Sequence, residues 1–473
     1  MTTTANNNSA RIQLLRKLLA NRVHPDEMGL HRDNWDSVSY FDSDSMSEID
    51  EFILIVSDAI QAKPDTTNLR ELSFLMRESS GKIKFQNNDQ IHNWLVACKS
   101  LVNQCQTDHN WRWKNGAEWY HDAINSVCGN AVHSSISVIL LNPNHSTQAE
   151  KDKFQKFITD LISTHIENSP YSHAEPVVAT LSRNALWLMR SFPNWLETIV
   201  FDSLQDSQIE TSRAFWQGFL VNRIWDLEFL KASALDGHIL KLLKHINENS
   251  LTYEDYLRRD SSESFVFLLV ELFLRTPPDQ QLTEFFKTFV MSHLNSRLFI
   301  RWLDAMSWSL QKIDSINYPN LSDEIFRQRL NPLLDLMSKL ELSPETVGII
   351  AESLGSLRTS FPGALRAWMD FKTKFHCQFS QNSRILMWLK NGTNGKFLIE
   401  NYPNELLNFI SIYLAEKNRD QSMTDWELSE FIAIFGLQIS NQNPSDFETF
   451  LINCRLLGFS RTIEIWTTTA AGI

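Results

Sequence analysis

The amino-acid sequence predicts an all-α protein, built as an irregular α-solenoid or multi-helical array of HEAT-like helix pairs. Gly and Pro number only 14 each in 473 residues, fewer than the tight turns of an all-β protein require. Apolar residues recur at helical spacing almost to the end of the chain. Proline-led stretches of one build recur towards the C-terminus, which favours stacked helical units.

The N-terminal part is predicted to hold a short polar end and a helical region. Residues 1–9 are polar and are expected to be disordered. Residues 10–110 form the predicted N-terminal helical region, whose first basic amphipathic helix either docks on the fold or faces a membrane or partner. Within it, residues 30–50 are acidic and serine-rich, which predicts a surface loop leading into a helix capped by Ser45 or Ser47.

The remaining chain is predicted to be helical throughout. Residues 111–320 form a central helical array, and residues 321–473 form C-terminal helical repeats. The best strand candidate, SSISVILL at residues 134–141, follows a helix-like run with no turn between them. We therefore expect this segment to be helical.

Five prolines are each followed by apolar residues at the third, sixth and seventh positions, namely Pro193, Pro344, Pro362, Pro403 and Pro444. Proline loses no hydrogen bond in the first turn of a helix, and the three apolar positions share one helical face. Each stretch therefore predicts a helix start with a buried stripe. From Pro344 onward the prolines are 18, 41 and 41 residues apart, which approaches a HEAT-type two-helix unit. The alternative is that helix-starting prolines have this spacing by chance.

The charge and the cysteine content limit which partners and which cellular compartment we expect. A formal net charge of −12 repels phosphate backbones, so nucleic acid is not the favoured partner unless a local basic groove exists. Five Cys without close pairing suit free thiols in a reducing compartment. The N-terminus lacks the pattern of a signal peptide, and no apolar run is long enough to span a bilayer. We expect a cytoplasmic protein with no membrane segment.

No motif predicts a catalytic, cofactor or metal site. GTNGK at residues 392–396 has two residues between its glycines, where a phosphate-binding loop needs four, so it is interpreted as a helix C-cap and turn. The Cys and His residues between positions 98 and 133 lack the close Cys pairs of a structural zinc site. We therefore assign no cofactor and no metal.

An aromatic cluster in NWRWKNGAEWY is the candidate partner-binding site, and it consists of Trp111, Trp113, Trp119 and Tyr120. Its Trp and Tyr content with nearby Arg and Lys is typical of protein-binding hot spots. The alternative is that these rings belong to the core.

Three stretches resemble the helical region that accompanies sirtuin domains in bacterial anti-phage defence proteins: AEWYHDAINSVCGNAV, VATLSRNALWLMRSFPNWLETIVFDSL and SRAFWQGFLVNRIWDLEFL. The matching residues are Ala123, Ile124, Asn125, Trp216, Gly218, Phe219 and Leu220. The resemblance covers roughly residues 110–415 and implies a role in sensing infection or regulating an effector. No sirtuin domain is recognised in the sequence, so any such activity is expected on another chain.

We therefore predict a non-enzymatic helical scaffold of a bacterial anti-phage defence system, which binds an effector or phage protein through its solenoid surface. Two alternatives stay open. One is a cryptic metal-dependent nuclease or hydrolase, for which His121 and Asp122 are the starting residues. The other is a nucleic-acid-binding component of a defence complex, which requires Lys and Arg to cluster in space.

Overall fold

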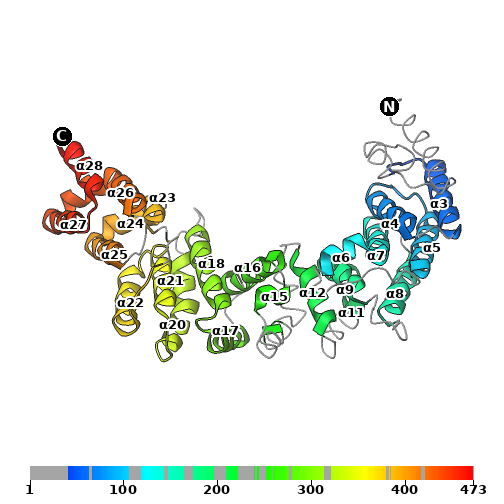
Figure 1. Ribbon diagram of the computed structural model, residues 1–473, viewed down its shortest axis with the longest axis horizontal. Helices are drawn as coiled ribbons and strands as arrows, with labels where there is room; N and C mark the ends of the chain where they lie inside the picture. Colours follow the sequence, from blue (N-terminus) through cyan, green and yellow to red (C-terminus); the bar gives the residue numbers. More distant parts are fainter. Residues whose placement is uncertain are drawn as a thin grey trace. The chain divides into compact units, whose positions relative to one another are not determined.

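The computed structural model describes most of the chain between residues 41 and 471. The described residues are 41–62, 66–105, 119–142, 147–163, 174–196, 209–221, 239, 242–243, 252–257, 259–275, 280–313, 321–379, 383, 385–391, 393–416 and 421–471. Their regular elements are all helices, and no strand occurs among them (Figure 1). The predicted all-α class is confirmed.

The chain divides into two compact units, one up to Ser264 and one from Phe265. The helices of unit 1 are α3 (Met46–Gln61), α4 (Thr66–Ser80), α5 (Asn88–Cys105), α6 (Trp119–Asn125), α7 (Val127–Leu141), α8 (Gln148–Ser163), α9 (Ala174–Arg183), α10 (Ala185–Ser191), α11 (Pro193–Leu196), α12 (Ile209–Val221) and α15 (Tyr253–Leu257). Helix α16 (Arg259–Arg275) contains the point of division. The predicted segments 10–110, 111–320 and 321–473 stay a prediction.

After α16, the helical elements of unit 2 are α17 (Gln280–His293), α18 (Arg297–Ile313), α19 (Leu321–Ile325), the π-helical turn η3 (Phe326–Leu330), α20 (Asn331–Met337), α21 (Pro344–Leu354), α22 (Phe361–Phe375), α23 (Ile385–Asn391), α24 (Thr393–Asn401), α25 (Pro403–Glu416), α26 (Gln421–Gln442), α27 (Pro444–Leu456) and α28 (Ser460–Ala471). Within the unit, each helix packs on elements near it in the sequence, for example α21 on α22 and α26 on α28.

The core of unit 1 forms around α7, which contacts α4, α5, α8 and α9. The strand candidate at residues 134–141 lies in this helix, as expected. Its apolar residues fill more than one face because neighbouring helices cover several of its sides. Trp94 of α5 is fully buried and donates its indole N–H to the Ser134 hydroxyl over 2.8 Å.

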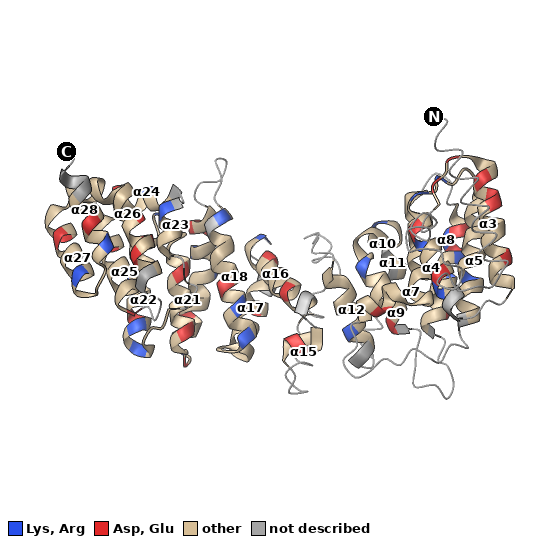
Figure 2. Ribbon diagram, turned by 45° about the horizontal axis from the view of Figure 1, so that its top comes forward, with Lys and Arg blue, Asp and Glu red and all other residues tan. Residues whose placement is uncertain are grey.

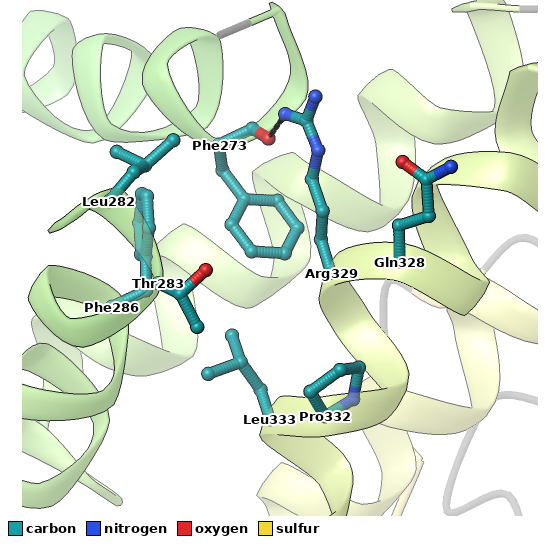
Figure 3. A pocket seen from close by; sticks show the side chains of 8 residues that line it. All are labelled: Phe273, Leu282, Thr283, Phe286, Gln328, Arg329, Pro332 and Leu333. Atoms are coloured by element: carbon teal, nitrogen blue, oxygen red, sulfur yellow. Dashed lines mark hydrogen bonds between the residues drawn. The ribbon is translucent and has the colours of Figure 1, made fainter. Parts of the chain in front are cut away.

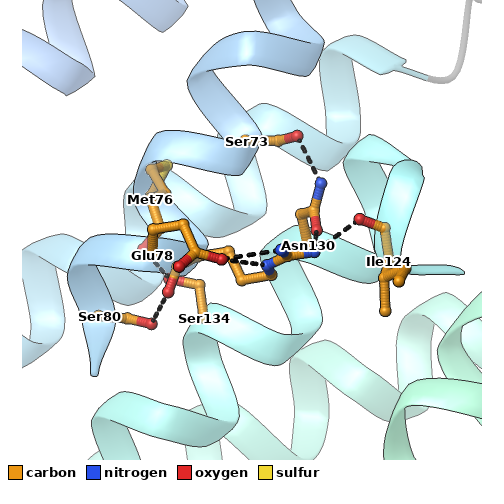
Figure 4. A network of polar contacts seen from close by, with 8 residues as sticks. Ser73, Met76, Glu78, Ser80, Ile124, Asn130 and Ser134 are labelled. Atoms are coloured by element: carbon orange, nitrogen blue, oxygen red, sulfur yellow. Dashed lines mark hydrogen bonds and ion pairs between the residues drawn. The ribbon is translucent and has the colours of Figure 1, made fainter. Parts of the chain in front are cut away.

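A polar network joins α4 to the start of α7 (Figure 4). The Arg77 guanidinium donates to the Glu78 carboxylate, to the Ile124 carbonyl at 2.7 Å and to the Asn130 side-chain oxygen at 3.0 Å. Asn130 in turn donates to the Ser73 hydroxyl over 3.1 Å. Because the Ile124 carbonyl lies at the end of α6, Arg77 ties three helices together at one side chain.

Helix α3 begins inside the segment 30–50 that was predicted as an acidic loop. Ser45 is its N-cap residue and Met46 its first residue. The Ser45 side chain makes no capping hydrogen bond, and Glu48 is the acidic residue in the first turn. Residues 1–40 lie outside the described residues, as does the basic amphipathic helix predicted among them.

Four of the five prolines predicted to start helices lie at the first or second residue of a helix in unit 2. Pro344, Pro403 and Pro444 are the first residues of α21, α25 and α27, and Pro362 is the second residue of α22. Ser343 and Asn443 accept hydrogen bonds from the third residues of their helices, which completes two of these N-termini. The apolar stripes are largely buried, with Met369 and Leu451 half-buried. The stripe after Pro193 lies outside the described side chains.

The interpretation of residues 392–396 as a C-cap and turn is wrong from Thr393 onward, because α24 begins there. Gly395 lies inside this helix. A Cβ atom at Gly395 would lie 1.7 Å from the Leu389 carbonyl oxygen of α23. Glycine is therefore used here for a close approach of two backbones.

Four cysteines, Cys98, Cys128, Cys377 and Cys454, are buried free thiols, as predicted. Among the described residues, no single helix is both long and apolar enough to cross a bilayer. The pair α6 and α7 reaches that length only across an 80° bend.

Candidate functional site

The predicted aromatic cluster is described at two of its four residues. Trp111 and Trp113 lie outside the described residues, whereas Trp119 and Tyr120 are the first two residues of α6. Trp119 is only 7% exposed and forms a core cluster with Ala123, Ala179 and Ala214. The Trp119 ring is therefore used to pack α6 against α9 and α12.

Two glycines allow the close packing around Trp119. A Cβ atom at Gly129 of α7 would lie 2.0 Å from the Ala123 carbonyl oxygen, and one at Gly218 of α12 would lie 2.1 Å from the Ala179 carbonyl oxygen. Neither position has room for a side chain. Gly218 belongs to the WQGFL stretch that carries the family resemblance, so this stretch has a packing role in the structure.

Tyr120 is half-buried beside a basic side chain. The Arg183 guanidinium carbon lies 5.1 Å from the centre of the Tyr120 ring, within the range of a cation–π contact. Burial raises the pKa of the Tyr120 hydroxyl, while the charges of Arg183 and Arg77 act in the opposite direction. The Tyr120 phenol is therefore neutral at ordinary pH.

His133 of α7 is affected by the same two arginines. Burial, followed by the positive charges of Arg183 and Arg77, lowers the pKa of His133 to about 4. Its Nδ1 atom is buried and has no hydrogen-bond partner. His133 is therefore a neutral imidazole at pH 7, and it titrates only in acid.

His121 and Asp122, the starting residues for a hydrolase, follow Tyr120 on α6. His121 is exposed and Asp122 is half-buried. Across the described part of the chain, no group of three or more His, Cys, Asp or Glu side chains could hold a metal ion. Within that part, His121 and Asp122 therefore do not belong to a three-ligand metal site.

A surface that the sequence did not single out runs along α26. Met423, Trp426, Ile434 and Leu437 are 45%, 38%, 52% and 42% exposed, respectively. Their spacing of three, eight and three residues places them on one face of the helix. We call these four residues the α26 stripe.

The α26 stripe spans about 21 Å, at 1.5 Å for each residue from 423 to 437. Glu430 lies between Trp426 and Ile434 and forms an ion pair with Lys390 of α23. The Lys390 ammonium also lies 5.6 Å from the Trp426 ring centre. The charges within the stripe are therefore paired, and the surface it offers is apolar and close to neutral.

The sequence held a signal for this surface. The opposite side of α26 is already buried through Leu428, Phe431, Ile432, Phe435 and Ile439. Apolar residues therefore occur on every side of α26, although one side is exposed. A helix with this pattern has more apolar surface than its own fold buries.

Comparison with known proteins identifies no relative: no family model, no curated protein and no solved structure matches the chain.

Proposed function

We propose that this chain is a non-enzymatic helical scaffold and that the α26 stripe binds an amphipathic helix of a protein partner. The observation that carries the proposal is the exposed apolar face of α26, which includes Trp426. Trp is the residue most enriched at the energetic centres of protein interfaces. A row of apolar side chains at helical spacing is complementary to the apolar face of a second helix.

The distribution of exposed apolar side chains supports this surface over others. Of the sixteen large hydrophobic residues exposed among the described residues, seven lie between positions 423 and 457. The rest are scattered over several helices of both units, as is usual for any protein surface. Four of the seven form the α26 stripe, and concentration on one helix face is what distinguishes an interaction site from ordinary exposure.

The charge distribution favours a protein partner over nucleic acid. Figure 2 shows basic and acidic residues interspersed along the described helices of each unit. A groove for a phosphate backbone requires a stripe of one sign instead. The paired charges Lys390 and Glu430 within the α26 stripe add no net attraction for an anionic polymer.

We further propose that the helices of unit 2 form an α-solenoid of HEAT-like pairs. A repeated hydrogen-bond pattern supports this. The Asp323 carboxylate accepts from the backbone N–H groups of residues 358–360, and the Asp425 carboxylate accepts from those of Arg461 and Thr462. In both cases an acid on one helix holds the start of a helix 35 to 37 residues later. That separation is close to one two-helix unit.

The biological setting stays a proposal that rests on the family resemblance. The partner would be an effector or a phage protein of an anti-phage system, met in the cytoplasm. The four buried free thiols suit that reducing compartment.

The proposal is tested by cross-linking from the stripe. A photo-reactive amino acid is placed at Leu437 in the full chain, and at Met291 of α17 as a control of comparable exposure. We expect the Leu437 probe to capture one protein in cells, through a segment whose apolar residues recur at helical spacing. Capture of the same protein by both probes, or capture of only a second copy of this chain, contradicts the proposal.

The captured protein is then purified and titrated with a matched pair of tryptophan variants. Trp426 and Trp308 are 38% and 44% exposed, and each has a lysine ammonium over its ring. We expect Trp426→Ala to weaken binding about 30-fold or more, which corresponds to about 2 kcal/mol. Trp308→Ala should leave the affinity unchanged. Equal affinities of the two variants would overturn the assignment of the stripe.

A further inference from the structure

A pocket in unit 2 is formed by α16, α17, η3 and α20 and is separate from the α26 stripe (Figure 3). It encloses about 350 Å³, including the part open to solvent. Its walls are mostly apolar and its residues are Phe273, Leu282, Thr283, Phe286, Gln328, Arg329, Pro332 and Leu333. The pocket is a shallow, partly open depression, so a ligand bound there keeps part of its surface in solvent.

The aromatic wall of this pocket is rigid. The rings of Phe273 and Phe286 meet edge to face with centres 4.9 Å apart. Both rings also contact the fully buried Trp302 of α18, at 5.3 and 5.7 Å. Because this wall is supported from behind by core packing, the pocket does not depend on a ligand to hold its shape.

The polar side of the pocket is created by the π-helical turn. Pro332, the second residue of α20, has no N–H to donate to the turn before it. The preceding segment widens, and the Asn331 N–H donates to the Phe326 carbonyl five residues back. Arg329 lies within this turn and is thereby placed in the wall of the pocket.

The Arg329 guanidinium has hydrogen-bonding capacity that the fold does not use. One terminal nitrogen donates to the Phe273 carbonyl, near the C-terminal end of α16 (Figure 3). The Nε atom is buried and has no hydrogen-bond partner. Burial lowers the pKa of Arg329, with the charge of Glu324 acting in the opposite direction. A partly desolvated cation with an unused donor is stabilised by an anionic acceptor.

We propose that this pocket binds a small apolar monocarboxylate, with one ring or a short branched chain against the aromatic wall and its carboxylate on Arg329. The apolar body is matched by Phe273, Phe286 and Leu333. A single negative charge is matched by the single cationic residue among the eight lining residues. A phosphate group, with two charges and three acceptor oxygens, fits this lining less well.

The same chemistry occurs in a free metabolite and in the last residue of a polypeptide, so the test has an arm for each. The ligands are 3-phenylpropionate, its neutral amide, and a Gly-Gly-Phe peptide with a free or an amidated C-terminus. Binding to the full chain is measured by calorimetry and by ligand-observed NMR. We expect the carboxylate form of each ligand to bind at least about tenfold more tightly than its amide. The tighter of the two carboxylates identifies the source.

Three variants locate the binding. Arg329→Gln removes the charge, and we expect about 10- to 100-fold weaker binding. Thr283→Trp fills the exposed mouth of the pocket without altering Arg329, and it should also abolish binding, which keeps the test valid if Arg329→Gln unfolds. Arg327→Gln is the matched control, because Arg327 lies in the same turn, outside the pocket lining.

Three results would overturn the inference. The first is the absence of saturable binding of either carboxylate at millimolar concentration. The second is equal binding of carboxylates and amides, and the third is an equal effect of Arg327→Gln and Arg329→Gln.

Discussion

Substitution of Asp323 tests whether hydrogen bonds between separate helices stabilise unit 2. Asp323 lies on α19 with no exposed surface. It accepts hydrogen bonds from the N–H groups of Arg358, Thr359 and Ser360 at 3.2, 3.0 and 3.1 Å. The Thr359 hydroxyl adds a fourth, at 3.1 Å. Ser360 is the N-cap residue of α22 and its side chain makes no capping bond, so a distant carboxylate replaces the local cap.

Substitution Asp323→Ala removes two acceptor oxygens, and with them four hydrogen bonds, from a buried site at once. Each hydrogen bond contributes about 1 kcal/mol, and a lost helix cap alone costs about 1 to 2 kcal/mol. We therefore expect the free energy of unfolding to fall by about 3 to 5 kcal/mol. Asp323→Asn keeps one acceptor oxygen and turns an amide N–H₂ towards the backbone donors, so we expect roughly half of that loss.

The assay combines urea unfolding with hydrogen exchange. Unfolding is followed by circular dichroism, and exchange of the amides at residues 358–360 is followed by mass spectrometry. Asp335 of α20 is exposed, and Asp335→Ala is the matched control, expected to change stability by less than about 0.5 kcal/mol. If Asp323→Ala is no less stable than this control, or leaves exchange at residues 358–360 unchanged, the carboxylate does not hold α22 and the reasoning is refuted.

Two further predictions concern a histidine and a pair of glycines. His133 has a pKa lowered from 6.5 to about 4, so below pH 6.5 the unfolded chain takes up a proton that the folded chain does not. Stability conferred by the neutral imidazole is complete above pH 6.5 and falls as the pH drops towards 4, by up to about 3 kcal/mol. Urea titrations should show that the free energy of unfolding of the unsubstituted protein is about 2 kcal/mol lower at pH 4.5 than at pH 7, and that His133→Gln lacks this loss. The same pH dependence in both proteins would contradict the prediction. Gly395→Ala forces a Cβ into the Leu389 carbonyl and should cost about 2 kcal/mol or more, whereas Gly363→Ala on α22, with open space around it, should stabilise by about 0.5 kcal/mol. Thermal melts that move both variants in the same direction would show that backbone contact is not the cause.

Local sequence patterns predicted the helices well. The prolines at 344, 362, 403 and 444 start helices because the first turn of a helix tolerates proline in any tertiary setting. The apolar positions that follow them are buried because helical periodicity fixes which residues share a face. The exception is the GTNGK segment, where Gly395 was expected in a turn but lies inside a helix and permits a close backbone contact there.

The candidate sites were less accessible to sequence reasoning. An aromatic-rich stretch is compatible with both a core and a binding surface, and only the fold shows that Trp119 meets three alanines from three helices. The α26 stripe was missed because its exposed side chains have the same types and spacing as buried ones. The pocket at Arg329 combines a π-helical turn with walls from α16 and α17, and the contacts between these helices are not contained in the local sequence pattern.

The sequence by itself determined the all-helical class, the starts of the proline-led helices and the stripes that those helices bury, because these depend on backbone stereochemistry and on residues three to seven positions apart. Only the tertiary structure decided which apolar stripe has no cover, which carboxylate caps a helix some 36 residues away, and which arginine keeps an unused donor beside an apolar pocket. Those properties depend on contacts between separate helices, and local periodicity does not specify which helices meet.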